Sequence, residues 1–61
     1  MTKRQQVKVW MEEDNLNVSE ESVANMFESV MDNMNEYKNL TLRQAYCCSY
    51  IEMMQKNIAK E

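Results

Sequence analysis

SEESVANMFESVMDNMNEYK, residues 19–38, is the stretch of sequence that decides the fold. At the spacing of an α-helix its apolar residues fall on one face, and acidic and amide side chains occupy the opposite face. The apolar face consists of Val23, Met26, Phe27, Val30, Met34 and Tyr37, with Met31 at its edge. Ser19 is a favourable N-cap, and Glu20 and Glu21 follow where the helix dipole favours negative charge. The segment therefore predicts an amphipathic helix over 19–38 that needs a partner surface.

The C-terminal segment repeats this pattern. Thr41 and Gln44 have the spacing of a capping box, in which each side chain bonds the other residue's backbone N–H. A narrow apolar stripe follows at helical spacing, made of Cys47, Ile51, Met54 and Ile58 and widened by Tyr50. Tyr46 and Met53 lie on a second flank, which is more apolar surface than one neighbouring helix covers. We predict a helix over 41–60 whose second flank contacts another subunit.

The N-terminal segment allows two interpretations. Val7, Trp10 and Met11 share a helical face, and Thr2 with Gln5 resembles a further capping box. Residues 7, 9 and 11 also alternate as in a strand, but a lone strand would have no partner within this chain. We therefore favour a helix over 2–14, in which Trp10 anchors the segment to the rest of the protein.

The absence of both glycine and proline restricts the connections. Turns that need positive φ must use asparagine or aspartate, and Asn15, Asn17 and Asn39 stand where such turns would fall. The predicted fold is all-α, a single domain over 1–61. It is a small three-helix unit built on an antiparallel helical hairpin between the last two helices. Its predicted core joins two sets of side chains: Phe27, Val30 and Met34 with Cys47, Ile51 and Met54.

The small size of the chain favours self-association. Sixty-one residues bury only about 60% of the surface that the unfolded chain exposes, so such a domain is marginal alone. Adjacent Cys47 and Cys48 are unsuited to bridging each other, and without histidine a structural zinc site lacks ligands. We therefore expect a homo-oligomer, such as a homodimer. Free thiols, the lack of a secretory signal and the lack of an apolar span favour a cytoplasmic protein without membrane contact.

The composition excludes the common forms of catalysis. No histidine is present to pair with a serine or cysteine nucleophile, and no glycine-rich loop can hold phosphate. The carboxylates are predicted to lie on a solvated helix face, whereas a general acid needs a buried position. We expect no enzyme activity and no cofactor or metal.

The distribution of charge points to a candidate binding surface. The net charge is -3, and residues 12–36 contain eight acidic side chains and no basic one. Glu28, Asp32 and Glu36 are spaced four residues apart, and like charges at that spacing destabilise a helix slightly, which favours a functional reason for their placement. The partner-binding candidates are Glu21, Glu28, Met31, Asp32, Glu36 and Met53, because methionine is common on adaptable binding surfaces. Alternatively the acids only solvate the helix, or pair with the cations of residues 3–8.

These features point to a small helical protein-interaction module of the inhibitor, adaptor or accessory type, which binds a protein with a basic surface. In general character, without a shared motif, its size and acidity resemble small phage-encoded inhibitors of host machinery. One alternative is nucleic-acid binding through Lys3, Arg4, Lys8 and Trp10, although three cations are few and the nearby acids would repel phosphate. The other alternative is a structural subunit of a larger assembly.

Overall fold

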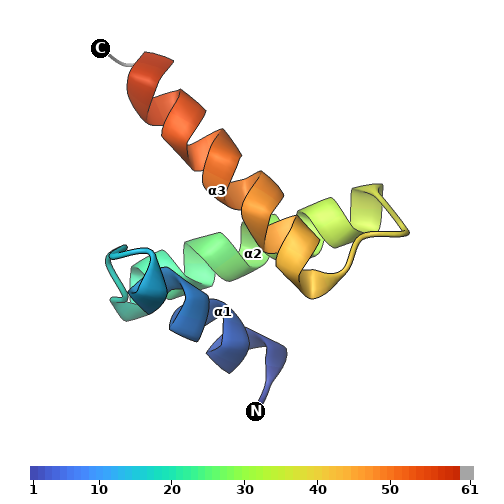
Figure 1. Cartoon of the computed structure of the whole chain (residues 1–61), viewed down its shortest axis with the longest axis horizontal. Coiled ribbons are helices and arrows are strands. Elements are labelled where there is room, and N and C mark those ends of the chain that lie inside the picture. Colours follow the sequence, from blue (N-terminus) through green and yellow to red (C-terminus); the bar gives the residue numbers. More distant parts are fainter. Residues whose placement is uncertain (60–61) are drawn as a thin grey trace.

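The protein folds into three consecutive α-helices, shown in Figure 1: α1 (Lys3–Glu13), α2 (Glu20–Glu36) and α3 (Leu42–Ala59). The structure is a computed structural model that describes the backbone of residues 1–59 and the side chains of residues 1–56. The prediction of an all-α chain is confirmed over that part, including the helix at the N-terminus. Within the same part, no helix is both long and apolar enough to cross a membrane.

Side-chain caps fix where the helices begin. Thr2 and Gln5 form a capping box, with distances of 2.8 Å from the Thr2 N–H to the Gln5 amide oxygen and 3.1 Å from the Gln5 N–H to the Thr2 hydroxyl. Thr41 and Gln44 form the same pair of bonds at 2.9 and 3.1 Å. Ser19 caps α2 by accepting the backbone N–H of Ser22 at 3.2 Å. The three predicted helix starts are confirmed.

The turn after α1 is a Schellman motif, the common helix end that uses a left-handed residue. Asn15 takes that conformation at φ 60°, its N–H bonds the Glu12 carbonyl at 3.1 Å, and the Leu16 N–H bonds the Met11 carbonyl at 2.9 Å. Asparagine tolerates this φ better than most residues, so it replaces the missing glycine. The left-handed turn predicted at Asn39 is wrong, because α2 instead ends at Tyr37 in an extended conformation, φ -116°.

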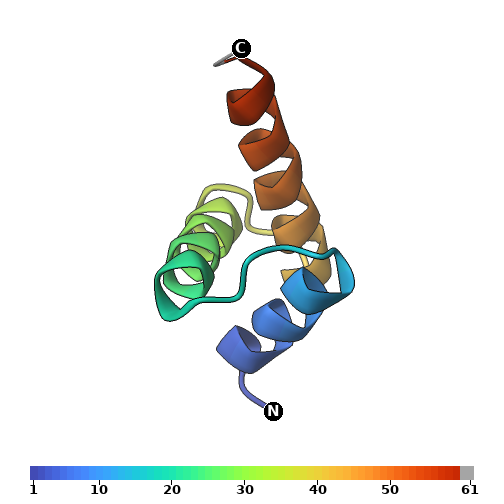
Figure 2. The ribbon, with the colours of Figure 1, turned by 90° about the vertical axis from the view of Figure 1, so that its left-hand side faces the viewer.

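The helices cross rather than lie side by side. Figures 1 and 2 show α3 passing α2 at a steep angle, with the C-terminal half of α3 extending beyond the crossing. The predicted antiparallel hairpin is therefore not confirmed as a packing arrangement, although α2 and α3 are consecutive and in contact. Helix α1 packs against α2 near the start of α2.

The core is small and draws on all three helices. Its buried apolar side chains are Val7 and Met11 of α1, Val23, Met26 and Val30 of α2, and Ala45 and Tyr46 of α3. Phe27 and Met34, predicted for the core, are half-buried and pack against it, whereas Tyr37 is 54% exposed. The apolar face predicted for residues 19–38 is thus confirmed at its centre and wrong at its C-terminal end.

Helix α3 presents the opposite face to the one predicted for the core. Ala45, Tyr46 and Ser49 are buried, whereas Ile51 and Met54 are 55% and 42% exposed and Cys47 is exposed as well. Ile58, the last residue of the predicted stripe, lies outside the described side chains. The predicted core contribution of Cys47, Ile51 and Met54 is wrong, because Tyr46 buries a larger side chain and Ser49 satisfies polar groups of α2.

Those polar groups form a small buried network at the crossing. The Asn33 amide donates to the Ser49 hydroxyl at 2.9 Å, and the Ser29 hydroxyl donates to the same oxygen at 3.0 Å. Asn33 and Ser49 are buried, and no buried side-chain N or O among the described residues lacks a partner. Because hydrogen bonds are directional, the network sets the rotation of α3 against α2.

Substitution of Ser49 by alanine is expected to lower the free energy of unfolding by about 1–3 kcal/mol, because the buried Asn33 amide loses its acceptor. Ser29→Ala is the matched control. It removes one donor at a half-buried position and leaves the 2.9 Å Asn33–Ser49 bond in place, so its cost should be below about 1 kcal/mol. Urea denaturation followed by circular dichroism measures both values. Equal costs for the two variants would contradict the assigned role of Ser49.

Candidate functional site

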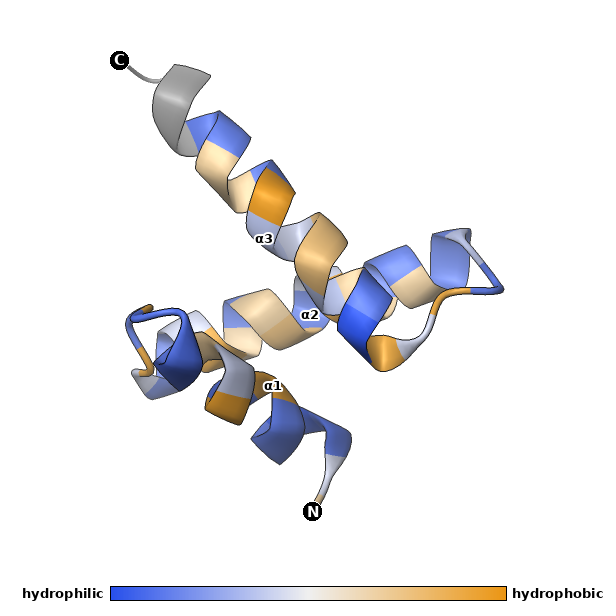
Figure 3. Ribbon diagram, in the orientation of Figure 1, coloured by the Kyte–Doolittle hydropathy of each residue, from blue (hydrophilic) through white to orange (hydrophobic). Residues whose placement is uncertain are grey.

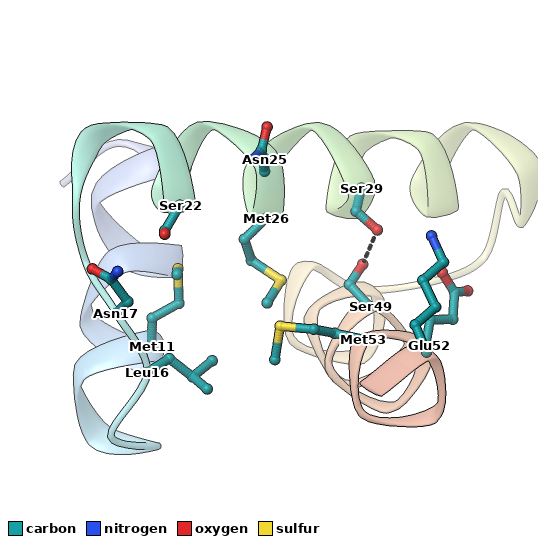
Figure 4. Close-up of a pocket in the computed structure, with 11 residues that line it drawn as sticks. Met11, Leu16, Asn17, Ser22, Asn25, Met26, Ser29, Ser49, Glu52 and Met53 are labelled. Atoms are coloured by element: carbon teal, nitrogen blue, oxygen red, sulfur yellow. Dashed lines mark hydrogen bonds between the residues drawn. The ribbon is translucent and has the colours of Figure 1, made fainter. Parts of the chain in front are cut away.

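A groove of about 390 Å³ lies between α2, α3, the end of α1 and the link that follows α1. Its apolar walls are formed by Met11, Leu16, Met26 and Met53, and serine and asparagine side chains complete the lining. Figure 4 shows Met26 pointing from α2 and Met53 pointing from α3 into the same space, with Met11 and Leu16 across from them. Flexible thioether side chains let such a groove adapt to the shape of an apolar partner.

A second, more open groove of about 470 Å³ continues along α2. It is lined by four acidic side chains and one lysine: Glu28, Asp32, Glu36, Glu52 and Lys56. Four residues line both grooves: Asn25, Ser29, Glu52 and Lys56. The two grooves are therefore one continuous trough, here named the α2–α3 trough, with a methionine-rich end and an acidic end.

Most of the predicted partner-binding residues lie in this trough. Four of the six line it: Glu28, Asp32, Glu36 and Met53. Glu21 is exposed in the first turn of α2 and lines neither groove, and Met31 is half-buried against the core. Sequence reasoning missed Leu16, Glu52 and Lys56 as part of this surface. The Schellman turn places Leu16 there, and the crossing of the helices brings the other two beside α2.

The predicted nucleic-acid contacts lie on α1 and line neither groove of the trough. Lys3, Arg4 and Lys8 are exposed along α1. The half-buried Trp10 ring packs against Tyr46, with ring centroids 5.5 Å apart, and the Arg43 guanidinium carbon lies 5.0 Å from the indole centroid. The indole is therefore engaged in contacts with α3, as its predicted role as an anchor requires.

Tyr46 links α3 to the end of α1. Its hydroxyl donates to the Asp14 carboxylate at 2.7 Å, and Arg43 lies above its ring, 5.4 Å from the centroid. Burial raises the pKa of the Tyr46 hydroxyl well above its usual value, and the hydrogen bond and negative charge of Asp14 raise it further. The positive charge of Arg43 acts in the opposite direction. The cluster therefore holds Tyr46 protonated and fixes the first helix to the third.

Among the described residues, no three acidic or thiol side chains converge as metal ligands would. Cys47 and Cys48 are free thiols, the first exposed and the second half-buried. Comparison with protein-family models, with curated proteins and with solved structures found no match for this chain. The trough is thus the strongest candidate site on physical grounds alone.

Proposed function

We propose that the protein is a non-enzymatic interaction module, of the inhibitor, adaptor or accessory type, and that it binds a basic amphipathic segment of another protein in the α2–α3 trough. The observation that supports this most is the continuity of the two grooves, since residues such as Ser29 and Glu52 line both. A helix with apolar residues at one end of its buried face and lysine or arginine at the other would match both parts of the trough.

The charge of the acidic end supports a basic partner. Glu28, Asp32 and Glu36 follow one another at intervals of four residues on α2, and Glu52 adds a fourth carboxylate from α3. Lys56 offsets part of that charge. Carboxylates gathered in a concave surface attract a cationic ligand over a longer range than single surface acids do. The methionine-rich end supplies apolar area that contributes affinity for a partner of either charge.

We also propose that the chain acts as a homo-oligomer in the cytoplasm. A domain of 61 residues, with a core of seven buried apolar side chains among the described ones, is marginal as a monomer. The two free thiols, with Cys47 exposed, suit a reducing compartment.

Binding of a synthetic probe tests the trough. An amphipathic Leu/Lys helix, labelled with a fluorophore, is expected to bind at least about tenfold more tightly than a Leu/Glu helix of the same apolar pattern. Replacement of Glu28, Asp32 and Glu36 by lysine should reverse that preference, because the acidic end becomes basic. Fluorescence anisotropy at low ionic strength measures all four dissociation constants.

A variant with the same change in net charge is the control. Lysine at Glu12, Glu13 and Glu21 alters three exposed acids that line neither groove, so the preference for the Leu/Lys helix should survive. Equal weakening in both triple variants would show attraction to the overall charge of the chain and would remove the trough as the binding site. Met53→Gln, at the other end, should weaken binding of both peptides.

A further inference from the structure

Helix α3 carries an apolar face that no other part of the described structure covers. Cys47, Ile51 and Met54 are exposed, and Ile51 and Met54 are among the most exposed large apolar side chains of the chain. Figure 1 shows the half of α3 that contains residues 51 and 54 extending past the crossing with α2, and Figure 3 shows apolar residues continuing along it. We name Cys47, Ile51 and Met54 the outer α3 face.

The spacing of the outer α3 face is that of a helix that pairs with another helix. Its residues are four and then three positions apart, which is the alternation of the two core positions of a coiled coil. Ile58 continues the spacing by a further four positions in the sequence, and its side chain lies outside the described ones. The three residues of the outer α3 face keep this register over two turns.

Beside Ile51 and Met54 the flanks of the outer α3 face are uncharged, which permits contact with an identical face. Arg43, one turn before Cys47, is charged, and its guanidinium lies over the Trp10 and Tyr46 rings. Cys48, Tyr50 and Gln55 border it at helical spacing. The charged side chains of this part of α3, Glu52 and Lys56, line the trough instead. A foreign partner would be expected to meet matching charges at such flanks, because flanking charges set partner choice between helices. A second copy needs no flanking charges, because the neutral flanks beside Ile51 and Met54 do not repel each other.

The surface area of the chain also fits a second copy. The chain exposes 4693 Å², whereas a compact monomer of 7.3 kDa exposes about 4,200 Å², so about 500 Å² is in excess. Its radius of gyration, 11.3 Å, likewise exceeds the roughly 10.5 Å expected for 61 residues. The excess approaches the roughly 600 Å² per partner at the lower end of specific interfaces.

We infer that the outer α3 face is the self-association surface of the protein, and that it binds the outer α3 face of a second copy in a symmetric dimer. The dimer specifies the homo-oligomer proposed above and leaves the trough open, because the trough lies on the opposite side of α3. Identical faces meet in such an interface, so both copies bury the same three side chains.

Multi-angle light scattering on the whole chain tests this interface. At rising concentration the wild type should approach twice the 7.3 kDa of one chain. Ile51→Lys with Met54→Lys should raise the dimer dissociation constant at least about 30-fold, the effect of losing one interface hot spot. Tyr37→Lys is the matched control, because Tyr37 is 54% exposed, as Ile51 is 55% exposed, and lies at the end of α2. Circular dichroism checks that all variants remain helical.

Different outcomes separate the interface from the wider proposal. A wild type that stays monomeric up to millimolar concentration would overturn both the homo-oligomer and its interface. A double variant that keeps the mass of the wild-type oligomer would overturn the outer α3 face alone. Neither result bears on peptide binding in the trough, which is measured separately.

Discussion

Truncation of Tyr46 to alanine is expected to lower the free energy of unfolding by about 3–5 kcal/mol, the usual cost of removing a buried aromatic side chain. Tyr46 is 1% exposed, packs against Trp10 and holds the end of α1 through Asp14. A domain of this length has a total stability of roughly 3–9 kcal/mol. The cost is comparable to that total, so the variant should lose much or all of its stability and unfold at a far lower urea concentration than the wild type. Urea titration followed by far-ultraviolet circular dichroism would show this.

Ile51→Ala is the matched comparison on the other face of the same helix. Ile51 is 55% exposed in the single chain, so its truncation should cost less than about 0.5 kcal/mol in the monomer. Any greater loss at high concentration should vanish on dilution, because it would come from the dimer. If instead Ile51→Ala unfolded the monomer and Tyr46→Ala did not, α3 would have the opposite face in the core.

The starts of the helices could be predicted from the sequence because they depend on local chemistry. Thr2 with Gln5, Thr41 with Gln44 and the Ser19 cap are each contained within a few residues, and the structure confirms all three. The same dependence on local chemistry left the ends of α1 and α2 ambiguous. Three asparagines were equally suited to a left-handed turn, and the structure uses Asn15 alone among the three.

The face of α3 that enters the core could not be predicted in this way, because α3 is apolar on both sides. Hydrophobicity alone favours the side with Ile51 and Met54 over the side with Ser49. The side with Ser49 is nevertheless the buried one, because Ser49 accepts a hydrogen bond from Asn33 at 2.9 Å and Tyr46 donates one to Asp14 at 2.7 Å. Both partners lie far away in the sequence. Such long-range polar contacts leave no periodic signal in the helix that makes them.

The candidate site was predictable to the same limited extent. The acidic row of Glu28, Asp32 and Glu36 is visible in the sequence because it lies on a single helix. Its junction with the methionine-rich end depends on how α3 crosses α2 and on the turn that directs Leu16 inward. The stripe that the sequence assigned to the core is the outer α3 face, and the flank assigned to a second subunit contains Tyr46. In the single chain Tyr46 is buried, whereas Ile51 and Met54 of the outer α3 face are exposed.

High pH should unfold the protein through Tyr46. In the folded chain burial raises the pKa of its hydroxyl above the usual 10.0, and Asp14 raises it further. Below pH 10 the hydroxyl is protonated in both states, so the stabilisation is fully present. Above pH 10 the unfolded chain releases this proton and the folded chain retains it, so the free energy of unfolding falls by about 1.4 kcal/mol per pH unit. The fall continues until the pH reaches the pKa of the folded state.

Tyr46→Phe isolates this effect from the other groups that titrate at high pH. The variant loses the hydroxyl and its 2.7 Å bond to Asp14, so it should be about 1 kcal/mol less stable at neutral pH. Because it cannot ionise at this position, its stability should decline less steeply above pH 10, and the two curves should converge and then cross. Urea titrations in matched buffers from pH 8 upward provide both curves. Curves that remain parallel would mean that Tyr46 ionises as easily in the folded chain as in the unfolded one, which its burial and its carboxylate partner oppose.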